Sequence, residues 1–144
     1  MNTLLSKIKD EISKSNYLEA ENLSWSLYEQ NKNDLVALKT LALCLLLQNK
    51  YYGSIDFYSL ALEKSPHDFD ILNNLSHLFL KIEEFTQSYE FCQKALAIDD
   101  SSYLPFVTLL DLSIRKRDYD HGCRLAEDLL KRITFDVLKN NPNI

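Results

Sequence analysis

A regular repeat runs through the chain and limits its fold more than any other feature. The sequence aligns without gaps in four rows of equal length: residues 1–34, 35–68, 69–102 and 103–136. One aromatic residue occupies the same place in each row: Tyr17, Tyr51, Phe85 and Tyr119. A regular period of this length is the signature of a protein built from stacked copies of one supersecondary unit. The chain is therefore expected to form a stack of four repeats.

Each row contains two stretches of helical spacing separated by a short polar break. In the second row, Leu38, Leu41 and Leu45 follow the i, i+3, i+7 spacing of one helical face, and Asn49 and Lys50 interrupt it. Only two Gly and three Pro occur, too few for a protein rich in tight β-turns. We predict an all-α fold with helices at residues 2–14, 17–30, 35–48, 51–64, 69–81, 85–98, 103–115 and 119–132, and the sequence leaves room for a short further helix near 134–140.

Small residues recur where the two helices of a row must approach each other: Ala20, Ser54, Ser88 and Gly122. Side chains of this size let two helix backbones lie close together. A second column, which contains Ala61 and Ala95, is expected to act in the same way between one row and the next. Asp34, Asp68 and Ser102 each precede a predicted first helix and are expected to cap its free N–H groups.

These features resemble the tetratricopeptide repeat, a helix–turn–helix unit of about 34 residues. The resemblance covers residues 1–136 and is strongest over residues 35–102. It implies a right-handed solenoid of helical hairpins whose first helices line a concave face, with residues 137–144 as a tail or partial capping helix. Lys7 and Glu11 stand where apolar residues are expected, which suits an end of the stack that faces water.

The balance of charge argues against a nucleic-acid partner. The net charge is −5 at pH 7, whereas nucleic-acid-binding domains usually carry a basic surface. The most apolar stretch, Leu35–Leu47, contains Lys39 and is too short to cross a bilayer, so membrane insertion is not expected. The N-terminus has no apolar run of signal-peptide length, and a cytoplasmic location is therefore expected.

No pattern of residues indicates catalysis. The sequence has no Gly-rich phosphate loop, no GxSxG and no HExxH. Cys44, Cys92 and Cys123 form no CxxC pair, and we expect them to be small semi-buried residues in a reducing compartment. His121 lies near Cys123, but two ligands do not make a zinc site. We predict that the chain is not an enzyme and holds no cofactor and no metal.

The first helices supply the candidate binding residues. Helical spacing identifies the face of these helices that stacking does not use, and the resemblance implies that this face is concave. The predicted partner-binding groove comprises Val36, Lys39, Leu43, Leu46, Leu47, Asn73, His77, Leu80, Lys81, Val107, Asp111, Ile114 and Arg115. Asp70 and Leu104 share the same face.

The first helix of the second row is apolar nearly all round, which is typical of a helix covered on every side. Two interpretations of Leu43, Leu46 and Leu47 follow. They form either a floor that a partner covers or a surface that the superhelix itself already covers. His77 lies on the same face of the stack and is either a contact residue or ordinary surface.

The expected partner is a protein, bound as a peptide or as an amphipathic helix. One subclass of the family grips a C-terminal carboxylate with Lys, Arg and Asn donors on successive first helices. Lys39 and Asn74 would match two of these donors. Leu43, Leu104 and Thr108 stand in the partner columns, where donors would be needed. We therefore predict that the chain is not a carboxylate clamp.

Three functions are compatible with these observations. The first is a free-standing scaffold or adaptor whose groove binds a peptide or helix. The second is an N-terminal, non-catalytic recruiting domain of a larger enzyme, such as a transferase. The third is a self-assembly module, because a stack of repeats must cover the apolar face of its last hairpin.

The last predicted helix carries an apolar surface suited to a homodimer: Leu125, Leu129, Leu130 and Ile133. After it, Phe135, Val137 and Leu138 could fold back as a short helical lid, although so short a helix is stable only when it docks. Otherwise two chains pair these faces about a twofold axis, or a downstream domain covers them. We expect self-association or a downstream domain rather than a self-sufficient lid.

The aromatic column yields a test of stability. We expect Tyr51→Ala to lower the free energy of unfolding by about 3 kcal/mol, because a large ring packed between helices is lost. Urea denaturation followed by circular dichroism measures this change. A loss below about 1 kcal/mol would mean that the ring is not a packing element.

Overall fold

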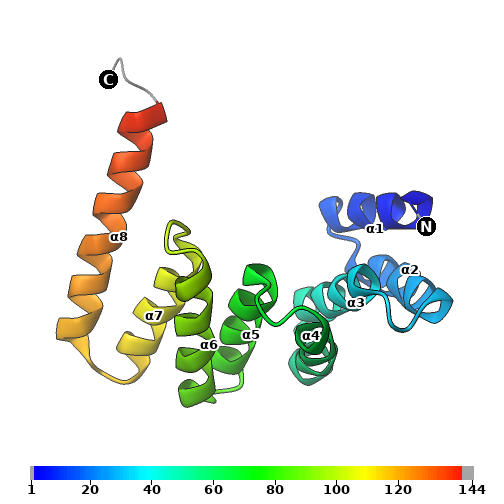
Figure 1. Cartoon of the computed structure of the whole chain (residues 1–144), viewed down its shortest axis with the longest axis horizontal. Helices are drawn as coiled ribbons and strands as arrows, with labels where there is room; N and C mark the ends of the chain where they lie inside the picture. Colours follow the sequence, from blue (N-terminus) through cyan, green and yellow to red (C-terminus); the bar gives the residue numbers. More distant parts are fainter. Residues whose placement is uncertain (1, 141–144) are drawn as a thin grey trace.

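The computed structural model describes residues 2–140 and consists of eight helices joined by short turns. The helices are α1 (Asn2–Ser13), α2 (Tyr17–Gln30), α3 (Leu35–Leu47), α4 (Tyr51–Lys64), α5 (Phe69–Lys81), α6 (Phe85–Ile98), α7 (Leu104–Arg115) and α8 (Tyr119–Asn140). No strand occurs within residues 2–140. Figure 1 shows the helices following one another along an arc, with α1 and α8 at opposite ends. The prediction of an all-α solenoid is confirmed.

The predicted helix boundaries hold to within one residue, except at the C-terminus. There the chain forms one continuous helix of 22 residues, and the separate helix near 134–140 that the sequence allowed does not form. No lid folds back, since Phe135, Val137 and Leu138 all remain exposed. Residues 137–140 continue α8 beyond the fourth repeat, and residues 141–144 of the predicted tail lie outside the described residues.

The turn inside each hairpin has the same conformation four times. Its central residue has a φ of about 60° in every repeat: Ser15, Asn49, Glu83 and Arg117. The next residue donates its backbone N–H to a carbonyl on the last turn of the preceding helix, as Lys50 does to Leu45 and Glu84 to Phe79. This bond satisfies a carbonyl that the helix end leaves free. The period of the sequence therefore extends to the backbone torsion angles.

All three predicted capping side chains accept a backbone hydrogen bond at the start of their helix, and two of them are the N-cap residues. The Asp34 carboxylate accepts a hydrogen bond from the backbone N–H of Ala37 at 2.9 Å, and Asp68 accepts one from Ile71 at 3.2 Å. Ser102 is not the N-cap residue of α7, which is Tyr103, but its hydroxyl accepts a hydrogen bond from the backbone N–H of Leu104, the first residue of α7, at 3.4 Å.

The small-residue column lies at the contact between the two helices of each hairpin. All four members are buried: Ala20, Ser54, Ser88 and Gly122. The Ser54 hydroxyl donates to the carbonyl of Ala42 and the Ser88 hydroxyl to that of Ser76, each at 2.7 Å. A Cβ on Gly122 would lie 3.4 Å from the Ser113 side chain, so this pair of helices is also tightly packed. The serines are thus small enough for close helix packing, and their hydroxyl groups also link the two helices by a hydrogen bond.

Consecutive hairpins are joined by another column on the second helices, which contains Ser24, Tyr58 and Cys92. Ser24 of α2 lies 3.2 Å from the Cys44 sulfur of α3. The amide of Asn74 in α5 donates to the hydroxyl of Tyr58 in α4 at 3.1 Å. The third member, Cys92 of α6, donates its thiol to the carbonyl of Pro105 in α7 at 3.1 Å. Each second helix is therefore covered at this position by the first helix of the next repeat.

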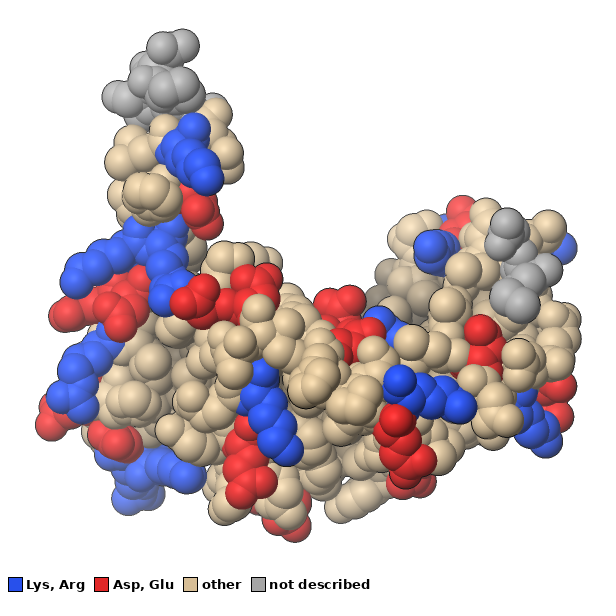
Figure 2. Space-filling model, in the orientation of Figure 1, with Lys and Arg blue, Asp and Glu red and all other residues tan. Residues whose placement is uncertain are grey.

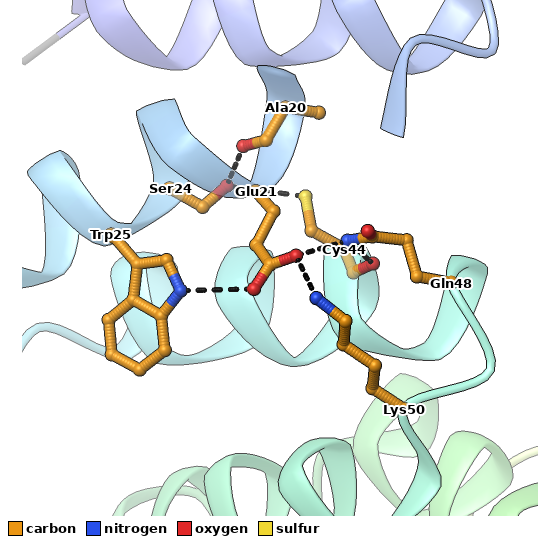
Figure 3. A network of polar contacts seen from close by, with 7 residues as sticks. All are labelled: Ala20, Glu21, Ser24, Trp25, Cys44, Gln48 and Lys50. Carbon is orange, nitrogen blue, oxygen red and sulfur yellow. Dashed lines mark hydrogen bonds and ion pairs between the residues drawn. The ribbon is translucent and has the colours of Figure 1, made fainter. Parts of the chain in front are cut away.

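A buried carboxylate reinforces the first of these contacts (Figure 3). Glu21 of α2 accepts hydrogen bonds from Lys50 at 2.7 Å, from Gln48 at 2.5 Å and from Trp25 at 3.2 Å. Burial by itself raises the pKa of Glu21, but these hydrogen bonds and the charge of Lys50 outweigh it and lower the pKa. The carboxylate therefore links α2 to the end of α3 and to the turn before α4.

The last hairpin is covered on one side only. Leu125 and Leu129 of α8 pack with Leu109 and Leu112 of α7 in the core. Both belong to the predicted dimer surface, but their packing in this cluster makes them core residues of the last hairpin. Leu130 and Ile133 are exposed. Of the four residues assigned to the dimer surface, two are therefore exposed and two pack in the core, and the dimer itself stays a prediction.

The Glu21 carboxylate gives a stability prediction. We expect Glu21→Gln to lower the free energy of unfolding at pH 7 by about 1–2 kcal/mol, because a charged acceptor of three hydrogen bonds is lost. A carboxylate with a lowered pKa stabilises the fold above its unfolded pKa, and this contribution disappears as the pH falls through the folded pKa. The difference between wild type and variant should therefore shrink in acid.

Denaturation curves at several pH values measure that difference. Glu19→Gln is the matched control, since Glu19 lies on the same helix and is exposed. Equal effects of the two substitutions would show that the buried network does not contribute to stability.

Candidate partner-binding face

The first helices of three successive repeats form a cleft of about 550 Å³. It is lined by Leu5 and Lys9 of α1, Val36, Lys39, Thr40 and Leu43 of α3, Tyr58 of α4, and Asp70 and Asn74 of α5. Cavities of this size hold small molecules or a few side chains of a protein partner. We call the surface made by α1, α3, α5 and α7 the first-helix face, and this cleft is its N-terminal part.

The cleft combines an apolar wall with a polar floor. Leu5, Val36 and Leu43 come from two helices and supply the wall. Tyr58 reaches the floor from α4, where its hydroxyl accepts a hydrogen bond from the Asn74 amide. Burial, followed by the negative charge of Asp70, raises the pKa of Tyr58 well above its usual range. The hydroxyl therefore keeps its proton and can donate it to a carbonyl oxygen.

The lysine in the cleft is already paired with acidic groups. The Lys39 ammonium lies 2.7 Å from the carboxylate of Asp68 and 3.8 Å from that of Asp70. Lys39 supports the loop before α5, because Asp68 is also the cap of that helix. A cation neutralised in this way is a poor anchor for a partner's carboxylate.

The C-terminal part of the first-helix face carries charged and titratable side chains beside the exposed Val107 and Ile114. Arg115 of α7 lies 3.2 Å from Asp111 on its own helix and 3.9 Å from Glu83. His77 of α5 is half-buried, and its burial, together with the positive charge of Lys81, lowers its pKa although Asp111 raises it. The imidazole is therefore neutral at pH 7 and can both donate and accept hydrogen bonds.

The structure separates the predicted groove residues by exposure. Val36, Lys81, Val107, Ile114 and Arg115 are exposed, whereas Lys39, Leu43, Leu47, Asn73, His77 and Asp111 are partly buried. Leu80 is fully buried with Phe106 and Leu112 in the core, so its assignment to the groove is wrong. Leu46 is partly buried and packs against the cluster that contains Leu38 and Ile71, which makes it a packing residue first.

Sequence reasoning missed four residues that line the cleft. Leu5 stands one row before Lys39 and Lys9 one row before Leu43, so the repeat itself pointed to both. Thr40 also lies on a first helix, next to Lys39. Tyr58 carried no such signal, because it lies on the second helix α4, whereas the groove was predicted on first helices only.

The described residues contain no group of three or more His, Cys, Asp or Glu arranged to hold a metal ion. Cys44 and Cys92 are buried, while Cys123 is exposed, contrary to the expectation that all three are semi-buried. Within residues 2–140, no helix is both long enough and apolar enough to cross a membrane. Acidic and basic side chains are interspersed on the side of the molecule seen in Figure 2.

No model of a protein family matches the sequence, and no curated protein sequence does. Solved structures do resemble it. MamA residues 41 to the end, from Desulfovibrio magneticus RS-1, match with a TM-score of 0.84 and 16% identity, over 91% of this chain and 74% of that one. A tetratricopeptide repeat protein from Parabacteroides merdae ATCC 43184 matches with a TM-score of 0.81 and 14% identity, over 91% of this chain and 51% of that one.

PcrH, solved in complex with the chaperone binding region of PopD, matches with a TM-score of 0.65 and 10% identity. The match covers 94% of this chain and 92% of the PcrH chain. The present chain therefore spans about half of the Parabacteroides protein and nearly all of PcrH. At these identities the likeness establishes the fold: the chain is a solenoid of the tetratricopeptide-repeat type.

The environment of His77 gives a titration to measure. We expect its imidazole to titrate below the ordinary value of 6.5 in a nuclear magnetic resonance experiment. Asp111→Asn should lower the midpoint further, because a negative charge that favours the imidazolium is removed. Lys81→Ala should raise it for the opposite reason. A wild-type midpoint above 6.5 would contradict the burial of this side chain.

Proposed function

We propose that this chain is a non-catalytic adaptor whose first-helix face binds a segment of another protein. The observation that carries the proposal is the cleft between α1, α3 and α5, where an apolar wall stands beside a protonated hydroxyl and a side-chain amide. Peptide-binding surfaces combine such pockets for side chains with polar groups for the main chain. A partner would place an apolar side chain against Val36 and Leu43 and a carbonyl oxygen near Tyr58.

The shape of the molecule supports this proposal. Figure 2 shows a hollow between the arm that contains α1 and the arm that contains α8. A concave surface made by successive repeats suits an extended peptide or an amphipathic helix. PcrH has the same fold and was solved with the chaperone binding region of PopD, which shows that this architecture can hold a segment of a second protein. The charges in the cleft are largely paired, so we expect the apolar contacts to dominate the affinity.

The experiment begins with a library of random peptides displayed on phage, selected against the purified chain. Affinities of the selected peptides are then measured for the wild type and for two variants, Val36→Lys and Leu43→Lys. We expect each variant to weaken binding at least tenfold, because a charge enters the apolar wall. Tyr58→Phe should weaken it less, since only one hydrogen bond is lost.

Leu60→Lys is the matched control. Leu60 is 42% exposed and Val36 is 44% exposed, but Leu60 lies on the second helix α4, away from the cleft. Circular dichroism of each variant is the check that it folds. Peptides that bind the wild type, Val36→Lys and Leu43→Lys equally well would show that the cleft is not the binding site.

A further inference from the structure

The outer side of α8 carries an apolar stripe formed by Ala126, Leu130 and Ile133. Leu130 is 63% exposed and Ile133 is 45% exposed, and Ala126 is half-buried. The i, i+4, i+7 spacing places these side chains along one line of the helix. Next to this stripe, the Arg132 guanidinium lies over the Phe106 ring and donates a hydrogen bond to the Asp100 carbonyl. These two contacts fix the position of α8 on α7. The C-terminal part of α8 projects past α7 (Figure 1).

The positions of Ala126 and Leu130 are covered in the two preceding repeats. Ala126 stands one row after Cys92 and two rows after Tyr58, and both of these side chains are buried against the next first helix. Leu130 stands one row after Leu96 and two rows after Leu62, which pack against the core clusters. Ala126 and Leu130 therefore belong to a stacking surface of the solenoid that no later hairpin covers within residues 2–140, and Ile133 extends this surface along α8.

We propose that a second copy of this chain covers the α8 stripe, with the two α8 helices antiparallel about a twofold axis near Leu130. In this arrangement the small Ala126 of one copy lies opposite the large Ile133 of the other, so the two surfaces interlock. Two Leu130 side chains meet at the axis. Helices with apolar residues at this spacing pack in a knobs-into-holes manner, in which each side chain fits between side chains of the facing helix.

Charges beside the stripe fit the same register. Glu127 and Lys131 lie on one flank of Leu130, both are exposed, and neither forms an ion pair within residues 2–140. In an antiparallel pair the same flank of each helix meets, which brings Glu127 of one copy to Lys131 of the other. The twofold axis repeats the contact, so two attractive pairs form and no like charges meet.

The N-terminal end of the stack cannot cover the stripe in the same way. On α1 the exposed residues between 3 and 13 are polar, and they include Thr3, Ser6, Lys7 and Asp10. Packing them against Leu130 and Ile133 would bury polar groups without partners. A head-to-tail contact between copies is therefore disfavoured, and a closed twofold dimer is the arrangement that satisfies the exposed apolar surface.

The first experiment is sedimentation velocity of the purified chain over a micromolar concentration series. We expect a monomer–dimer equilibrium. Leu130→Glu should raise the dissociation constant at least tenfold, because each dimer then buries two carboxylates at its axis. Leu18→Glu is the matched control, since Leu18 is also 63% exposed but lies on α2. It should leave the dissociation constant unchanged.

The second experiment tests the register with exchanged charges. Glu127→Lys alone and Lys131→Glu alone should each weaken the homodimer, because each places like charges together twice. An equimolar mixture of these two variants should form a heterodimer at least as stable as the wild-type dimer, because every facing pair is then attractive. If the substitutions acted only within their own helix, mixing the two variants would not restore the stability of the dimer.

Four results would overturn the proposal. A wild-type chain that stays monomeric throughout the series would show that the stripe does not pair with a second copy. Assemblies that grow beyond a dimer would indicate head-to-tail contacts. Equal effects of Leu130→Glu and Leu18→Glu would place the contact elsewhere. Failure of the mixed variants to recover would exclude the antiparallel register.

Discussion

The contact between one hairpin and the next is the constraint on which the rest of the structure depends. Each hairpin has an apolar side that it cannot bury alone, so a repeat is stable only beside its neighbour. The three core clusters reflect this, because each takes residues from two adjacent repeats. Polar groups join the same contacts, as the Tyr58 hydroxyl and the Asn74 amide do between α4 and α5. Stability is therefore distributed along the chain.

The same contacts create the candidate binding face. When α3 packs between α2 and α4, its remaining side must face outward, and the side chains on it are set by the helical period. Tyr58 links the two roles. Its ring belongs to the core cluster with Leu38 and Leu75, while its hydroxyl reaches the floor of the cleft. A partner bound there would contact a residue that also joins two repeats.

The sequence predicted the helices well because the period repeats four times and each row supports the others. It predicted the small-residue contacts for the same reason. The exposure of individual groove residues was harder to predict, and Leu80 shows why. It occupies the column of Leu46 and Ile114, yet it is fully buried while Ile114 is exposed. Burial depends on what the next repeat places opposite a residue, and the spacing within one helix does not contain that information.

The end of α8 could not be predicted for a related reason. The repeat gave no guide beyond residue 136, and a short docked helix and a longer continuous one have similar sequence patterns. Nothing in the four rows distinguished them. In the structure the helix continues to Asn140. Arg132 contacts the Asp100 carbonyl in the loop before α7 and the Phe106 ring on α7, and α8 extends beyond these contacts.

The two ends of the stack differ in chemistry, and this difference limits how the molecule could assemble. A solenoid with apolar surface at both ends would polymerise, because each copy would offer a site for the next. Here the exposed residues of α1 are polar and those of the α8 stripe are apolar, so the proposed association through α8 would close after two copies. The clefts of both copies would stay open in such a dimer, because the cleft is formed by α1, α3, α4 and α5, far from the stripe along the chain. A partner with two binding segments could then engage both clefts at once, and its overall affinity would rise through the high effective concentration of the second segment without any new contact.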